Sequence, residues 1–310
     1  RDEEALASYS RAVELAPDYA WAWNGRGLAL SALDRHEEAL ACFRRAAALQ
    51  PDDVWFWYNQ ADELILLHLY EDALAPLERA LRLNRDHAES WAKRGQALRR
   101  LGRYKESVAA YDQALKLEPG YAWAWNGRGL ALEAMERREE ALLSYERAAQ
   151  EDPSSIWYCI NQIEPLLSLG RLEEALHVSE QAITIEPGNE SAWARKGQIL
   201  RRMDRHAEAV EAYDQAITLS PEYGWAWNGK GLAFSALERY EDALVCFVRA
   251  TEVAPRDVWF WHNRGEALMQ LERWEEAVSI FSRALELDPS HRPSREKRTQ
   301  ARQQLGSSDE

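Results

Sequence analysis

The sequence is poor in cysteine and has no long apolar segment. Its three cysteines, Cys42, Cys159 and Cys246, stand far apart and form no Cys-x-x-Cys pair, so neither a disulfide framework nor a thiolate metal site is indicated. We interpret them as small buried side chains in a reducing compartment, which favours the cytoplasm. No apolar run approaches the roughly 20 residues that a transmembrane helix needs. Association with a membrane is therefore not expected.

An excess of positive charge is also missing. The 52 acidic residues outnumber the 38 basic residues, which gives a formal net charge of −14. Proteins that bind nucleic acids carry surplus lysine and arginine to neutralise phosphates. The charge balance therefore argues against a nucleic-acid partner.

Motifs for catalysis and cofactor binding are missing as well. The seven histidines show no His-Glu-x-x-His or other metal-ligand spacing. Gly25-Arg26-Gly27 lacks the third glycine and the preceding strand of a dinucleotide-binding loop. Acidic pairs such as Glu37-Glu38 fit the first turn of a helix, where carboxylates interact favourably with the helix dipole. We expect no enzymatic activity, no metal site and no cofactor.

Repetition is the dominant feature that is present. Prolines recur at intervals of 34 residues or twice 34, at Pro17, Pro51, Pro119, Pro153, Pro187, Pro221, Pro255 and Pro289. Taking this proline as place 32 of a repeat defines eight full repeats without insertions, from residues 20–53 to residues 258–291. Place 4 is tryptophan in seven of them, place 8 is glycine in six, and place 27 is alanine in all eight.

This pattern resembles the tetratricopeptide repeat, in which tryptophan, glycine, alanine, an aromatic residue, alanine and proline follow in that order. The resemblance implies an all-α fold: an α-solenoid in which antiparallel helix pairs, one A helix and one B helix per repeat, form a right-handed superhelix. Small residues at places 8 and 20 allow the two helices to approach closely, and the proline ends the B helix. We expect 18 helices, nine of each type, and no strand.

A longer period of 102 residues lies above the first. The segment YAWAWNGRGLA begins at Tyr19, recurs from Tyr121 and recurs with two changes from Tyr223. The predicted solenoid, residues 1–306, therefore divides into the modules 1–102, 103–204 and 205–306, followed by a polar tail at 307–310. Because the chain begins at Arg1 inside a helical pattern, we expect it to be part of a longer protein.

The resemblance implies that the A helices line a concave groove, and place 2 of these helices is rich in tryptophan. Places 2 and 4 are about 200° apart around a helix, so their side chains cannot enter the same core. The place-2 tryptophans either bind a partner or pack on the neighbouring A helix. They are Trp21, Trp55, Trp123, Trp157, Trp225 and Trp259.

Polar residues accompany these tryptophans with the same period. An asparagine can both donate to and accept from a peptide backbone, and cations bind carboxylates or phosphates. Solvated side chains and salt bridges within this acidic chain are the alternatives. The candidate residues are Asn24, Asn126 and Asn228 at place 5; Asn59, Asn161 and Asn263 at place 6; Asp62, Glu164 and Glu266 at place 9; and the third-repeat cations Lys93, Arg99, Arg100, Arg195, Arg201 and Arg202.

The expected function is that of a protein–protein interaction scaffold that binds an extended peptide or protein segment in the groove. One alternative is a sensor or regulatory arm of a larger signalling protein, such as a STAND-type ATPase. Another is a self-assembling repeat scaffold. The identity of the partner is not encoded in any motif of the sequence.

Overall fold

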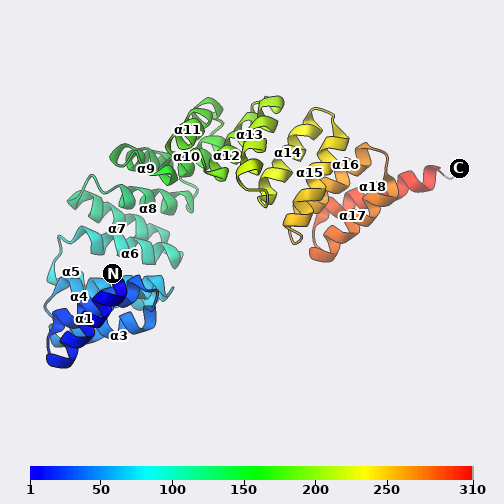
Figure 1. The fold of residues 1–310 in the computed structure, drawn as a ribbon. Helices are drawn as coiled ribbons and strands as arrows, with labels where there is room; N and C mark the ends of the chain where they lie inside the picture. Colours follow the sequence, from blue (N-terminus) through cyan, green and yellow to red (C-terminus); the bar gives the residue numbers. More distant parts are fainter. Residues whose placement is uncertain (309–310) are drawn as a thin grey trace. The chain divides into compact units, whose positions relative to one another are not determined.

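The protein is helical throughout the part that the structure describes. The computed structural model describes residues 1–308, and these form eighteen α-helices without a β-strand, which confirms the predicted fold class and helix count (Figure 1). The B helices are α1 (Asp2–Leu15), α3 (His36–Leu49), α5 (Tyr70–Leu83), α7 (Tyr104–Leu117), α9 (Arg138–Glu151), α11 (Leu172–Ile185), α13 (His206–Leu219), α15 (Tyr240–Val253) and α17 (Trp274–Leu287). The A helices are α2 (Ala20–Ala32), α4 (Val54–Leu66), α6 (Ala88–Arg100), α8 (Ala122–Glu133), α10 (Ile156–Ser168), α12 (Glu190–Arg202), α14 (Gly224–Ala236), α16 (Val258–Gln270) and α18 (Arg292–Ser308).

The A helices from α2 to α16 end in a turn of constant geometry. At Asp34 the backbone is left-handed, with φ of 56°, and the Asp34 and Arg35 N–H groups donate to the carbonyls of Ser31 and Leu30. This arrangement satisfies the last carbonyls of the helix. The constant turn keeps every repeat at the same length. The left-handed residues of the other repeats are His68, Gly102, Glu136, Gly170, Asp204, Glu238 and Glu272.

In six of the eight full repeats, the core is an aromatic ring of the B helix that lies on a glycine of the A helix. A Cβ atom on Gly27 would lie 2.6 Å from the Phe43 ring, and one on Gly95 would lie 2.9 Å from the Tyr111 ring. Both rings are fully buried. The glycine at place 8 is therefore required by the close approach of the two helices.

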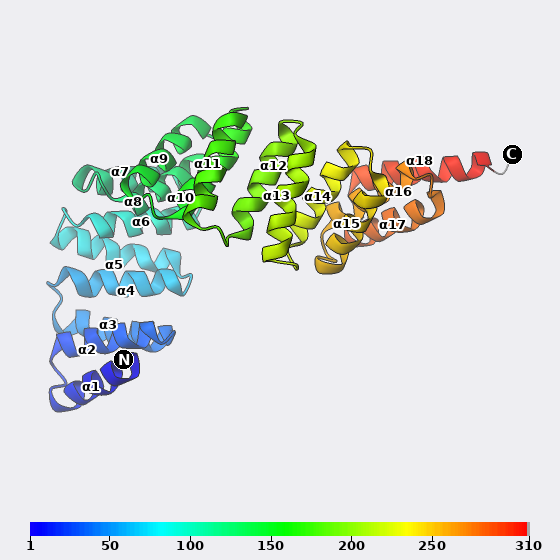
Figure 2. The ribbon, with the colours of Figure 1, turned by 45° about the horizontal axis from the view of Figure 1, so that its top comes forward.

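The helices group into two compact units, Arg1–Pro153 and the part from Ser154 onward. Within each unit, successive A helices contact one another, whereas the B helices pack chiefly against the A helices on either side. Figure 2 shows this stacking for α1 to α6 of the first unit. We call the layer of A helices in each unit its A face.

The unit boundary lies inside the module predicted at residues 103–204. At the other end, α18 continues through Ser308, so the first half of the tail predicted at 307–310 is helical, and residues 309–310 lie outside the described residues. No helix within residues 1–308 combines the length and the apolar character that crossing a membrane requires.

Candidate binding surface on the A helices

Two place-2 tryptophans of the first unit, Trp21 and Trp55, are half packed and half exposed. Trp21 contacts Phe56 of the next A helix edge-to-face, with ring centroids 4.9 Å apart. Trp55 contacts His87 in the same way at 4.7 Å. The two side chains nevertheless remain 44% and 43% exposed. Packing on the neighbouring helix and availability to a partner are therefore both features of these residues.

The other place-2 tryptophans differ in how far neighbouring side chains cover their rings. Lys93 lies over the ring of Trp123, with its Nζ atom 5.3 Å from the ring centroid, and Arg195 lies over Trp225 at 5.4 Å. Both rings are only partly exposed. Trp259 is exposed like Trp55, and Trp157 stands in the first turn of α10 at the start of the second unit.

The tryptophans at place 4 are fixed by a hydrogen bond that the place-2 residues lack. The indole N–H of Trp23 donates to the carbonyl oxygen of Pro17, 2.8 Å away, and that of Trp91 donates to Arg85 at 2.9 Å. Within residues 1–308, the indole N–H groups of Trp21 and Trp55 donate no hydrogen bond. The two places therefore serve different surfaces, as the helical geometry predicts.

The asparagines join consecutive A helices. Asn59 donates a side-chain hydrogen bond of 2.8 Å to the side-chain oxygen of Asn24, and Asn263 donates the same bond to Asn228. Asn24 is only 4% exposed. These pairs hold repeats together, and the Asn59 residue is only partly buried. The corresponding Asn126 and Asn161 lie in different units.

The acid at place 9 of each second repeat pairs with a cation at place 6 of the following repeat. This is the salt-bridge alternative that the sequence left open. The cation of the last pair, Lys297, was missed by the sequence analysis, although it stands two modules after Lys93. The pairs are Asp62 with Lys93, Glu164 with Arg195 at 3.4 Å, and Glu266 with Lys297 at 2.8 Å.

The remaining cations of the third repeats stand at the ends of α6 and α12. Burial raises the pKa of the Tyr111 hydroxyl to about 12, although Arg99 beside it acts in the opposite direction. Burial likewise raises the pKa of Tyr213 to about 12 against the effect of Arg201. Arg202 donates to the Leu167 carbonyl at 3.3 Å. The side chain of Arg100 is exposed.

His87, which the sequence analysis did not select, caps helix α6. The backbone N–H of Ser90 donates to His87 Nδ1 at 3.2 Å, so this nitrogen carries no proton and the neutral ring is protonated at Nε2. Burial lowers the pKa of His87. In the second module the equivalent residue, Asn189, accepts a hydrogen bond from the Ala192 N–H at 3.1 Å.

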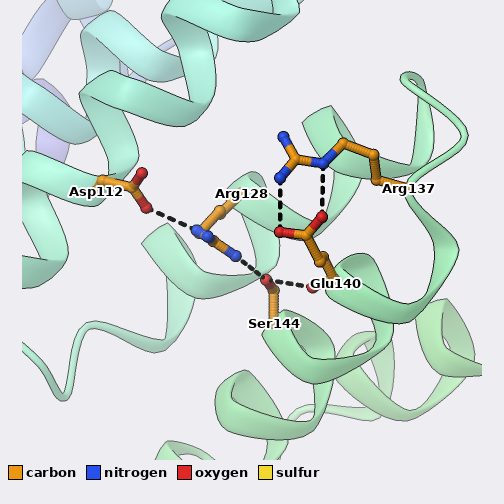
Figure 3. Close-up of polar contacts among 5 residues, drawn as sticks. All are labelled: Asp112, Arg128, Arg137, Glu140 and Ser144. Carbon is orange, nitrogen blue, oxygen red and sulfur yellow. Dashed lines mark hydrogen bonds and ion pairs between the residues drawn. The ribbon is translucent and has the colours of Figure 1, made fainter.

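A polar cluster ties α8 to the B helices on both sides. Arg128 donates to Asp112 at 2.7 Å and to Ser144 at 2.8 Å, and Arg137 forms a two-bond pair with Glu140 (Figure 3). An open cleft of about 700 Å³ next to this cluster is lined by Arg128, Asp112 and Ser144. Because these groups already bind one another, the cluster is structural. Within residues 1–308, no three His, Cys, Asp or Glu residues are grouped as metal ligands would be.

Several models of one repeat family match the sequence. A model described as TPR repeat matches residues 1–34 and 95–136. Models described as tetratricopeptide repeat match residues 20–53 and 191–223, residues 228–292, and residues 124–155. Together these matches cover more than half of the chain. No curated protein matches the sequence.

Solved structures with this arrangement of helices share little sequence with the chain. The APC/C hetero-tetramer Cut9–Hcn1 is 13% identical with a TM-score of 0.61, and the match covers 96% of this chain and 58% of that one. YrrB, a TPR protein with an unusual peptide-binding site, is 21% identical with a TM-score of 0.50, covering 58% and 92%. MamA is 20% identical with a TM-score of 0.50, covering 55% and 92%. At these identities the likeness shows the fold.

Proposed function

The chain belongs to the tetratricopeptide repeat family, whose repeats form protein-interaction scaffolds, and from this premise we propose that its A face binds an extended segment of a partner protein. The half-exposed pair Trp21 and Trp55 carries this proposal. A tryptophan side chain has about 150–250 Å² of surface. Adjacent exposed rings of this size mark interaction sites more often than solvated surface.

The polar groups around the pair support an extended ligand. Asn59 is partly accessible and offers an amide beside the tryptophans, and an amide can bond to the backbone of an extended chain. The buried Asn24 and the ion-paired Lys93 are engaged within the protein. The likeness in fold to YrrB, which has a peptide-binding site, supports the same kind of ligand.

A displayed library of random peptides tests the proposal. The chain is immobilised, peptides are selected on it, and each enriched peptide is measured against a Trp21→Ser/Trp55→Ser variant. Leu143→Ser is the control, because Leu143 is an exposed apolar residue of the B helix α9. We expect enriched peptides to bind the control normally and the double variant at least about tenfold more weakly, a loss of about 1.4 kcal/mol. Peptides that bind both variants like the original chain would refute the proposal.

We also propose a cytoplasmic location. All three cysteines are free and buried, and burial raises the pKa of the Cys42, Cys159 and Cys246 thiols. Such thiols stay protonated and suit a reducing compartment. Imaging of a tagged chain in its own cells would test this location, and a signal outside the cytoplasm would contradict it.

A further inference from the structure

We propose that the segment bound by the first unit is a proline-rich stretch in the polyproline II conformation. Its pattern is proline-x-x-proline-x-x-lysine or arginine, with the prolines on Trp21 and Trp55 and the cation on Glu89. These three residues are the second residues of α2, α4 and α6, and we call them the place-2 row. The inference rests on the proposed binding function of the A face and specifies its ligand.

The spacing of the row selects the conformation. The A helices α2 and α4 touch through Trp21 and Phe56, whose ring centroids are 4.9 Å apart, and helices in contact are about 8–10 Å apart. A polyproline II helix advances about 9.3 Å in one turn of three residues. Every third residue of such a segment therefore faces successive A helices from the same side. In a β-strand, residues three apart point to opposite faces. An α-helical ligand advances only about 1.5 Å per residue and would use every seventh residue.

The chemistry of the two tryptophans fits this ligand. Their exposed rings are flat apolar surfaces of the kind on which proline-rich segments dock. A polyproline II segment has no internal hydrogen bonds, so its carbonyl groups accept from outside. The indole N–H groups of Trp21 and Trp55 are donors without a partner in residues 1–308, whereas the place-4 indoles already have theirs.

The negative charge in the place-2 row specifies the third residue of the ligand pattern. Glu89 is 40% exposed and pairs with no lysine or arginine in the described part of the chain. Its carboxylate lies 3.6 Å from His87 Nε2, and that ring is neutral because Ser90 donates to its other nitrogen. Lys93 on the same helix is bound by Asp62. A carboxylate without a cationic partner, in the same row as two tryptophans, complements a basic ligand residue.

Three synthetic, fluorescently labelled peptides test the inference by fluorescence polarisation. The first carries proline-x-x-proline-x-x-lysine, the second has one extra residue between the prolines, and the third has glutamate in place of lysine. We expect the first peptide to bind at least about tenfold more tightly than the other two, a difference of about 1.4 kcal/mol. Equal binding of the second peptide would overturn the spacing argument.

Variants of the chain complete the test. Glu89→Lys should reverse the preference between the lysine and glutamate peptides, whereas the control Glu139→Lys, an exposed acid of α9, should not. Trp21→Ser/Trp55→Ser should lose both ligands while the circular dichroism spectrum stays helical. An unchanged preference in Glu89→Lys would overturn the charge argument.

The outcomes separate this inference from the function on which it rests. If library peptides require Trp21 and Trp55 but contain no spaced prolines, the inference is wrong and the binding function stands. If no peptide of either kind depends on these tryptophans, both are wrong.

Discussion

The side-chain amide of Asn59 donates a hydrogen bond to the side-chain oxygen of Asn24, 2.8 Å away on the preceding A helix. The link from second to third repeat is instead an ion pair, Asp62 with Lys93. The link from third to first repeat is a close approach, since a Cβ on Gly127 would lie 2.4 Å from the Tyr111 ring. Because these three kinds of contact between repeats follow one another in a fixed order, the residues that form them recur at every third repeat.

This order changes the meaning of the 102-residue period. Contacts between repeats explain the recurrence of the Asn24–Asn59 and Asn228–Asn263 pairs and of the three acids at place 9, because each of these residues has a partner in the neighbouring repeat. The exposed halves of Trp21 and Trp55 have no such explanation. These exposed surfaces therefore favour the binding of a partner, and the asparagines favour it only where their amides stay accessible.

The asparagine link should contribute measurably to stability. Asn24→Ala leaves a partly buried amide of Asn59 without its acceptor, and we expect a loss of about 1–3 kcal/mol. Asn59→Ala should lower the free energy of unfolding less when Asn24→Ala is already present than it does alone. A double-mutant cycle in urea measures this coupling, and the Asn228–Asn263 pair provides a matched cycle in the second unit. Strict additivity in both cycles would contradict the assignment.

Gly27→Ala should destabilise the first unit although alanine favours helices. The added Cβ would lie 2.6 Å from the Phe43 ring, and overpacking of this kind costs about 1–3 kcal/mol. Gly306→Ala is the control, because its Cβ would meet nothing within 4 Å. Phe43→Leu should recover part of the loss in the double variant. The urea midpoints of the original chain, Gly27→Ala, Gly306→Ala and the double variant Gly27→Ala/Phe43→Leu are compared. A Gly27→Ala variant that is more stable than the original chain would disprove the close packing of Gly27 on Phe43.

Trp91→Ala should cost more than Trp21→Ala. Trp91 is less exposed, and its indole N–H is bonded to the Arg85 carbonyl, so we expect a loss of about 3 kcal/mol or more. Trp21 is almost half exposed. Trp21→Ala should therefore lower the free energy of unfolding by only about 1 kcal/mol, in proportion to the smaller area that this side chain buries. Denaturant midpoints decide the order. Equal losses would argue against the separation of the two faces.

Much of the fold was predictable because contacts in a solenoid are local. Each repeat touches only its neighbours, so the spacing of Pro17 and Pro51 and of their equivalents already predicts the helix pairs. Helical geometry also separated places 2 and 4. The partner of Asn24 was not predictable, because it depends on how far one A helix is shifted along the next. His87 was missed because histidine is not among the usual N-cap residues.

His87 should make stability depend on pH. Its pKa in the folded state lies below the ordinary value of 6.5. Above that pH both states are neutral, whereas below it the unfolded chain takes up a proton that the folded ring resists. Stability is therefore lost as the pH falls from 6.5 through the lowered value, with a slope of at most about 1.4 kcal/mol per pH unit.

The variant His87→Asn should remove this part of the pH dependence. Asn189 shows that asparagine accepts the same backbone hydrogen bond in the second module, so the helix keeps its cap. Urea midpoints of both proteins between about pH 7.5 and pH 5 cover the window set by the histidine pKa. The same pH profile in both proteins would exclude His87 as the titrating group.

The second unit should hold a weaker site for the same class of peptide. Trp225 and Trp259 repeat the pair Trp21 and Trp55, but Arg195 covers the ring of Trp225. The next place-2 residue is Pro293 instead of an acid. We therefore expect calorimetry to show two classes of site, the weaker one indifferent to the ligand's lysine and abolished by Trp225→Ser/Trp259→Ser. A ligand with two proline segments should gain affinity only while both pairs are intact, because the second contact becomes intramolecular. One class of site that survives loss of either pair would show that binding does not follow the modules.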